Sequence, residues 1–258
     1  MVTNKLKKIW NKNDYALNGW ISINNPFSAE IMSRQNYDTL TIDMQHGLID
    51  YSDLLGILQA ITGSGVMPIV RVPWLDPAYI MKSLDAGAEG IICPMINNKK
   101  EAEQFVSYMK YPPLGNRSFG PTRQNIVNGT DYFKNANKNV LCIAMIETDE
   151  AMKNLSEIIS TDGLDAVYIG PADLTLGTTQ GRLLPGMDRE EDEMIERIKT
   201  ILSEAKKMDK KACLHCVKTS YAIKAIKWGF DLVTLNSDTR LLATSAADSI
   251  NEFRNGIK

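Results

Sequence analysis

The chain has 258 residues, of which 44% are hydrophobic and 23% charged, a composition typical of a globular protein that buries a large core. Its formal net charge of −2 gives no basis for a nucleic-acid partner or an anionic membrane surface. No apolar run reaches the ~18–20 residues of a membrane span, and no apolar segment of a secretory signal follows the basic start.

Eight apolar, β-branched runs predict strands at residues 16–23, 37–44, 67–72, 89–95, 139–147, 164–170, 211–216 and 230–236. Between them, capping residues, early prolines and terminal glycines predict helices at residues 50–65, 76–87, 98–111, 148–160, 188–208 and 218–229. Strict alternation of strand and helix implies right-handed crossovers and a parallel sheet.

Eight such units in about 250 residues predict a closed (β/α)8 TIM barrel, formed as a single domain over residues 1–258. An open doubly wound sheet is the alternative. That fold usually has a glycine-rich dinucleotide loop after its first strand, and the segment that follows here, "NNPFSAE", has none.

Four cysteines, Cys93, Cys142, Cys213 and Cys216, are present; three lie inside apolar strand-like runs, and Cys216 is the last residue of one. They predict buried thiols in a reducing, cytoplasmic compartment. The segment "CLHC" resembles half of a zinc site, but a second pair of ligands is missing. On a strand Cys213 and His215 share one face and Cys216 lies on the other, so a structural role is favoured.

One connection, residues 112–138, is unusually long for a compact domain. Such segments are commonly functional loops or lids. We expect it to shape the substrate pocket together with residues 174–186, and Arg117, Arg123 and Arg182 would suit an anionic substrate tail.

Barrel enzymes carry their active sites at the carboxyl ends of the strands. Polar side chains gather at those ends in this sequence: Asp43, Gln45, His46, Arg71, Glu147, Asp173, His215 and Asn236. A scaffold gains nothing from such a cluster, because unpaired charges are costly to remove from water. The pattern therefore predicts an active site at one mouth of the barrel.

Glu147 and Asp173 each follow an apolar strand, on two consecutive strands. Two neighbouring carboxylates repel each other unless a cation lies between them, and Mg²⁺ or Mn²⁺ prefers such oxygen ligands. Each residue alone fits a cap equally well, Glu147 of the following helix and Asp173 of a short turn. Their matching positions favour a metal site.

Arg71 lies within an apolar strand and should bind an anion or pair with Asp43 as a structural salt bridge. His46 follows Asp43 by three residues. A lone histidine is commonly a core residue with its hydrogen bonds satisfied, but the nearby Asp43 and Arg71 favour a general base.

The motifs "IDMQHG", "RVPW", "PMINNKKEAE", "YPPLGNRSFGP" and "IGPADL" resemble the metal-dependent pyruvate aldolases typified by 2,4-dihydroxyhept-2-ene-1,7-dioate (4-hydroxy-2-oxoheptanedioate) aldolase. These enzymes belong to the citrate lyase β-subunit superfamily, and the similarity runs from about residue 15 to 245. The resemblance implies a TIM barrel with a divalent metal, Mg²⁺ or Mn²⁺, with Co²⁺ or Zn²⁺ as further options. It also implies a homohexamer that exchanges a C-terminal helix between subunits.

Residue by residue, the resemblance implies that Glu147 and Asp173 are the metal ligands and that Arg71 contacts the keto-acid oxygens. It implies that Asp43 holds His46 as the catalytic base, and that Asp85 reaches the histidine of a neighbouring subunit. The backbone at Gly170, Pro171 and Ala172 would bind the pyruvate carboxylate. Met145 and Gln45 stand where the best-known members carry glutamine and glutamate, a difference that bears on substrate and metal preference.

The expected activity is that of an aldehyde-lyase: retro-aldol cleavage of a 4-hydroxy-2-keto acid to pyruvate and an aldehyde. A Schiff-base aldolase is disfavoured, because no interior strand offers a lysine late in its run. Two alternatives remain open, an acyl-CoA lyase of the malyl- or citramalyl-CoA type and a non-catalytic keto-acid-binding protein.

Overall fold

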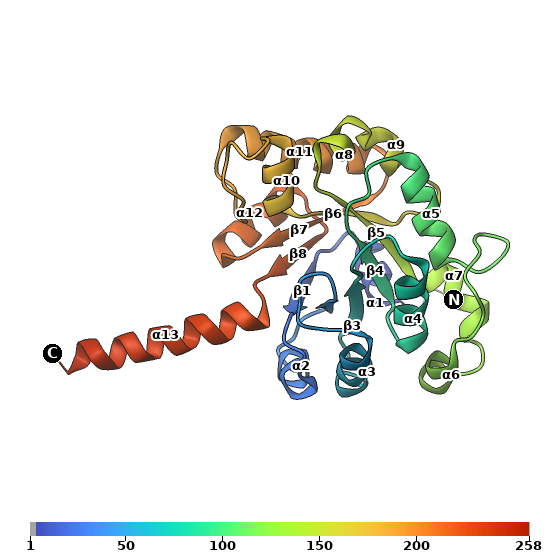
Figure 1. The fold of residues 1–258 in the computed structure, drawn as a ribbon, viewed down its shortest axis with the longest axis horizontal. Coiled ribbons are helices and arrows are strands. Elements are labelled where there is room, and N and C mark those ends of the chain that lie inside the picture. Colours follow the sequence, from blue (N-terminus) through green and yellow to red (C-terminus); the bar gives the residue numbers. More distant parts are fainter. Residues whose placement is uncertain (1–3, 258) are drawn as a thin grey trace.

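The structure is a computed structural model and describes residues 4–257. Eight parallel strands close in sequence order into a barrel (Figure 1). They are β1 Ala16–Ile21, β2 Thr39–Asp43, β3 Met67–Arg71, β4 Gly90–Cys93, β5 Leu141–Ile146, β6 Ala166–Ile169, β7 Lys211–Cys216 and β8 Leu232–Leu235. Each lies within one of the eight predicted runs, which confirms the predicted (β/α)8 fold.

The helices are α1 Lys5–Trp10, α2 Pro26–Ser33, α3 Tyr51–Ala60, α4 Pro77–Ala86, α5 Lys99–Met109, α6 Thr122–Asn128, α7 Tyr132–Asn139, α8 Asp149–Lys153, α9 Leu155–Ile159, α10 Pro171–Thr178, α11 Asp192–Lys207, α12 Thr219–Trp228 and α13 Asp238–Gly256. Local sequence explains their ends. Asp50 and Asp53 form a capping box at the start of α3. Asp76 caps α4, which begins with Pro77 and is followed by Gly87, its C-terminal cap, with φ of 129°.

Two apolar clusters hold the barrel together. The larger fills the space between the sheet and the surrounding helices. The smaller lies inside the barrel and includes Trp20, Ile69, Met145 and Tyr168, which alternate along their strands with residues of the outer cluster. Helix α1 adds to this inner cluster and so covers the amino-terminal end of the barrel. The opposite end is therefore the one that remains for a site.

The four cysteines are buried and free, as the sequence predicts. Cys213 belongs to the inner cluster and Cys216 to the outer one, so they face opposite sides of β7. The CLHC segment therefore does not converge on a metal.

Residues 112–138 lie away from the mouth of their own barrel. The expectation that they shape the substrate pocket of the same chain is therefore wrong. Helix α5 returns the chain to the amino-terminal end of the strands, and α6 and α7 fold there. Arg123 donates to the carbonyl of Ala86 and Gln124 to those of Leu84 and Ala88, at the end of α4. The segment is long because it holds two short helices, whose mixed polar sequence gave little periodicity.

Helix α13 extends away from the barrel (Figure 1). Its first residue, Asp238, is buried and accepts hydrogen bonds from the backbone N–H groups of Ser22 and Ile23 just after β1. Beyond that anchor its apolar side chains, such as Leu242 and Phe253, are exposed. Among the described residues, no helix combines the length and apolar character needed to cross a membrane.

Candidate active site

Asp43 and Arg71 form a forked ion pair at the carboxyl ends of β2 and β3. Arg71 donates from Nε at 2.8 Å and from Nη2 at 2.7 Å to the two carboxylate oxygens. Trp20 donates from Nε1 to the same carboxylate at 3.2 Å, and the guanidinium lies 4.8 Å from its ring centroid. Burial acts to raise the pKa of Asp43, but the hydrogen bonds and charge of Arg71 outweigh it, and the pKa is lowered.

The pairing of Arg71 with Asp43, which the sequence left as an alternative, is thus present. The guanidinium of Arg71 has five N–H groups. Two of them bind Asp43, and the others are available to a ligand. The pair fixes a positive group at the mouth in one orientation.

Glu147, directly after β5, is a second buried carboxylate at the mouth. It is 2% exposed, and its Oε1 accepts the backbone N–H of Met95 at 2.9 Å. Its Oε2 is buried without a hydrogen-bond partner in the described part of the chain. Burial raises the pKa of Glu147 to about 7, and the charge of nearby Asp173 acts in the same direction.

Gly170 makes room for the unpaired oxygen. A Cβ at this position would lie 2.7 Å from Oε2 of Glu147 and 2.8 Å from Cε of Met145. Gly170 also precedes α10, whose amino terminus has no side-chain cap. Its first N–H groups are therefore available to an anion. Asp173 is exposed in the first turn of α10.

Glu147 and Asp173, the two predicted metal ligands, lie at the same mouth and are close enough to interact electrostatically. Within residues 4–257, no group of three or more His, Cys, Asp and Glu side chains could hold a metal ion. A cation at Glu147 and Asp173 would therefore need oxygens from substrate, water or backbone, which suits a hard divalent ion.

His46 lies at the same end, in the loop after β2, with an exposed side chain. Asp43 accepts its backbone N–H at 3.3 Å, so Asp43 orders the loop and does not contact the imidazole. The side-chain oxygen of Gln45 beside it is buried without a partner among the described residues.

Asp85 is not part of this cluster in its own chain. It lies in the last turn of α4, at the other end of the barrel, and accepts a 2.6 Å hydrogen bond from Nη2 of Arg117. Burial raises the pKa of Asp85 against the influence of that arginine.

The sequence did not single out Trp20, which joins two parts of the mouth. Besides its contacts with Asp43 and Arg71, its ring meets the edge of His215 at 4.7 Å between centroids. The sequence pattern that could have placed Trp20 inside the barrel is the two-residue period of β1, in which Asn18 and Trp20 share the inward face.

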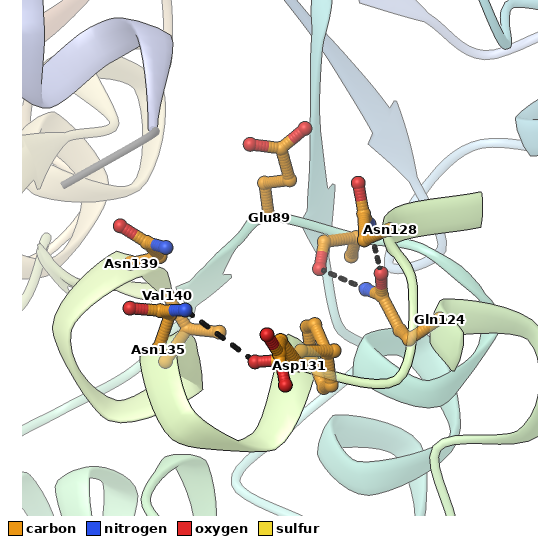
Figure 2. A pocket seen from close by; sticks show the side chains of 9 residues that line it. Glu89, Gln124, Asn128, Asp131, Asn135, Asn139 and Val140 are labelled. Carbon is orange, nitrogen blue, oxygen red and sulfur yellow. Dashed lines mark hydrogen bonds between the residues drawn. The ribbon is translucent and has the colours of Figure 1, made fainter. Parts of the chain in front are cut away.

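A separate cavity of about 230 Å³ lies between the start of β4 and helices α6 and α7 (Figure 2). Several of its polar groups bind one another or the backbone, as Asn128 does with Gln124. It includes none of the predicted site residues, so the mouth of the barrel remains the candidate active site.

Comparison with known proteins identifies the family. Residues 18–244 match the HpcH/HpaI aldolase/citrate lyase family, and the chain belongs to it. It is 40% identical to a hydroxypyruvate/pyruvate aldolase of Rhizorhabdus wittichii, over 97% of this chain and 99% of that protein. It is 29% identical to a 5-keto-4-deoxy-D-glucarate aldolase of Shigella sonnei, over 97% of both.

A solved structure gives the same result for the fold. The crystal structure of a HpcH/HpaI aldolase/citrate lyase family protein from Burkholderia cenocepacia superposes with a TM-score of 0.88 at 25% identity. The superposition covers 98% of this chain and 100% of the Burkholderia cenocepacia chain. The protein is therefore a member of an aldolase/lyase enzyme family, and the resemblance in its motifs is confirmed at that level.

Proposed function

We propose that the protein is a divalent-metal-dependent pyruvate aldolase. It would cleave a 4-hydroxy-2-keto acid to pyruvate and an aldehyde, and catalyse the reverse addition. The observation that carries this proposal is Glu147, a buried carboxylate with one oxygen unpaired among the described residues, next to Asp173 and Arg71. The names of the two curated relatives agree with a keto-acid aldolase.

The donor set fits a hard cation such as Mg²⁺ or Mn²⁺, with Co²⁺ or Zn²⁺ as alternatives. Glu147 and Asp173 would hold it, with Gly170 leaving space beside Oε2. When bound, the ion would polarise the keto group and offset the negative charge that develops as the C3–C4 bond breaks. Met145, apolar and buried next to Gly170, keeps that side of the site dry.

The backbone at Gly170, Pro171 and Ala172 would bind the carboxylate of the keto acid. This segment begins α10, and the free N–H groups and the dipole of a helix amino terminus favour an anion. Arg71, held in one orientation by Asp43 and Trp20, adds fixed positive charge on the keto-oxygen side.

His46 would take the proton of the C4 hydroxyl through water in the cleavage direction and return it in the addition. Its exposure in the single chain leaves room for the further contact that the resemblance implies, with Asp85 of a neighbouring subunit. Asp85 would then bind both its own Arg117 and that histidine.

A homohexamer with exchanged α13 helices would supply that neighbour. The apolar residues Leu242 and Phe253 of α13 are 65% and 68% exposed, and Leu48 and Trp74 at the barrel mouth are 78% and 55% exposed. Burying such side chains between subunits would be favourable. A chain ending after Arg240 should sediment as a monomer if α13 mediates assembly, and an unchanged oligomer would contradict the exchange.

The activity has a direct test. In deuterated water the protein with Mg²⁺ or Mn²⁺ should exchange the C3 protons of pyruvate, as followed by proton NMR. EDTA should abolish exchange, and so should Glu147→Ala, whereas Glu103→Ala on the exposed face of α5 should leave it unchanged. Exchange that persists in EDTA would refute the metal mechanism, and exchange without cleavage of any 4-hydroxy-2-keto acid would refute the aldolase.

A further inference from the structure

His215 occupies the inner face of β7 at the level of the site, and the mechanism above does not use it. Pairing of β5 with β6 ends at Ile146 and Ile169, and pairing of β6 with β7 continues to Leu214. The next residues in register are Glu147, Gly170 and His215. The imidazole is half-buried and interacts electrostatically with Arg71 and Asp43 across Trp20.

A chain of hydrogen bonds inside the barrel determines which nitrogen of His215 carries the proton. Thr39 donates to Oδ1 of Asn18 at 2.7 Å, and Nδ2 of Asn18 donates to Oγ1 of Thr234 at 2.8 Å. The hydroxyl of Thr234 lies 2.6 Å from that of Tyr168, which lies 3.1 Å from Nδ1 of His215.

Thr234 accepts from Asn18, and Tyr168 is its only other side-chain hydrogen-bond partner among the described residues. Thr234 is fully buried and its proton needs an acceptor, so we assign that proton to the oxygen of Tyr168 and the proton of Tyr168 to Nδ1 of His215. Nδ1 is then an acceptor, so neutral His215 carries its proton on Nε2. Burial and the charge of Arg71 lower the pKa of His215 to about 3, which keeps the ring neutral near pH 7.

Nε2 makes no hydrogen bond within the part of the chain that the structure describes, so its N–H is available to a ligand. The position of the keto acid indicates which atom it meets. With the carboxylate at α10, after β6, and the keto oxygen turned towards Glu147 on β5, C3 faces the other neighbour of β6, which is β7. This placement rests on the proposed function.

We infer that His215 is a specificity-determining residue whose Nε2–H donates a hydrogen bond to a hydroxyl on C3 of the keto acid. The class of nucleophile it selects is the 3-hydroxy-2-oxo acids, of which hydroxypyruvate is the smallest. Pyruvate has no oxygen at C3 and leaves the donor without a substrate partner. A site built to bind a hydroxyl discriminates against the analogue that lacks it.

The test is the ratio of kcat/KM for hydroxypyruvate to that for pyruvate, measured with Mn²⁺ and the same aldehyde acceptor. His215→Phe keeps a ring of similar shape without the donor, and the ratio should fall about tenfold or more. His215→Gln restores an N–H donor and should recover part of the ratio. A ratio in His215→Phe within twofold of the wild-type value would overturn the inference.

A second measurement does not depend on turnover. Nitrogen-15 NMR at pH 7 should show the ring of His215 protonated on Nε2 alone, and Tyr168→Phe should remove this bias. A proton on Nδ1, or a charged ring, would overturn the inference. Wild-type protein that exchanges pyruvate protons but rejects hydroxypyruvate would overturn it and leave the aldolase intact. Absence of exchange or addition with both pyruvate and hydroxypyruvate would overturn both.

Discussion

Replacing Glu147 by glutamine should stabilise the metal-free protein at alkaline pH while removing its response to metal. The carboxyl is 2% exposed, and its pKa is raised to about 7 from the ordinary 4.5, first by burial. The folded chain therefore binds this proton more tightly than the unfolded chain. Consequently the free energy of unfolding falls as pH rises from about 4.5 through about 7.

The size of the effect follows from the two pKa values. The difference between 4.5 and about 7, at 1.36 kcal/mol per pKa unit, amounts to about 3 kcal/mol above pH 7. Glutamine keeps an oxygen for the N–H of Met95 and carries no charge, so it avoids this loss. For a chain of this size, about 3 kcal/mol corresponds to roughly 5–10 °C in Tm.

The assay is thermal unfolding in EDTA between pH 5 and pH 8.5, for wild type, Glu147→Gln and the exposed control Glu103→Gln. Taking the difference between variant and wild type removes the contributions of other titrating groups. The gain in Tm should be small at pH 5 and should grow to its full value by pH 8. Mn²⁺ should then raise the Tm of wild type and control but not of Glu147→Gln.

Two results would refute this reasoning. A Glu147→Gln protein that is less stable than wild type at pH 8 would mean that the carboxylate is satisfied in the folded chain. An equal rise in Tm with Mn²⁺ for both proteins would mean that the ion binds elsewhere.

Three further predictions concern the same mouth. Arg71→Lys should lower kcat/KM for pyruvate proton exchange at least about 100-fold, because lysine cannot reproduce the planar fork; Arg34→Lys, at an exposed position after α2, is the control, and equal rates for Arg71→Lys and wild type would assign Arg71 a purely structural role. Gly170→Ala should weaken Mn²⁺ binding in titration calorimetry at least about tenfold, because its Cβ would lie 2.7 Å from Oε2 of Glu147; unchanged affinity would move the ion away from that oxygen. His215→Gln should resist acid better than wild type. In the wild type the pKa of His215 is about 3 in the folded chain, against an ordinary 6.5, so the stability that the neutral ring contributes above pH 6.5 is lost as pH falls. The difference should reach about 2 kcal/mol at pH 5 in denaturant titrations, and parallel pH curves would contradict it.

The barrel could be predicted from sequence because each strand is a dense apolar run with a polar residue at its end. Both faces of a parallel barrel are buried, so the runs stand out without alternation. The ends were overestimated, as at β4, where the run of residues 89–95 contains a strand of only Gly90–Cys93. Met95 adopts φ of 56° there and turns its N–H to Glu147. Nothing in a strand propensity encodes that turn.

Helices α6 and α7 were missed for a different reason. Their sequences are short and polar, and they fold against the carbonyls at the end of α4 through Arg123 and Gln124. Such helices owe their stability to tertiary contacts and not to an apolar stripe. Trp20 was overlooked because its role depends on partners from β2, β3 and β7, whose proximity only closure of the barrel provides.

Some polar groups inside the barrel have all their hydrogen bonds within the chain, whereas Glu147 does not. This difference supports a structural role for the first kind and a ligand-binding role for Glu147. Asn18, Thr234 and Tyr168 are paired with one another, as buried polar groups must be for a stable fold. Glu147 lies one layer nearer the mouth and is left half-satisfied, at a cost of about 3 kcal/mol above pH 7. A carboxylate that only capped α8 could be replaced by an uncharged residue with a gain in stability. The unpaired oxygen next to Gly170 is therefore best explained by a ligand that the folded chain binds.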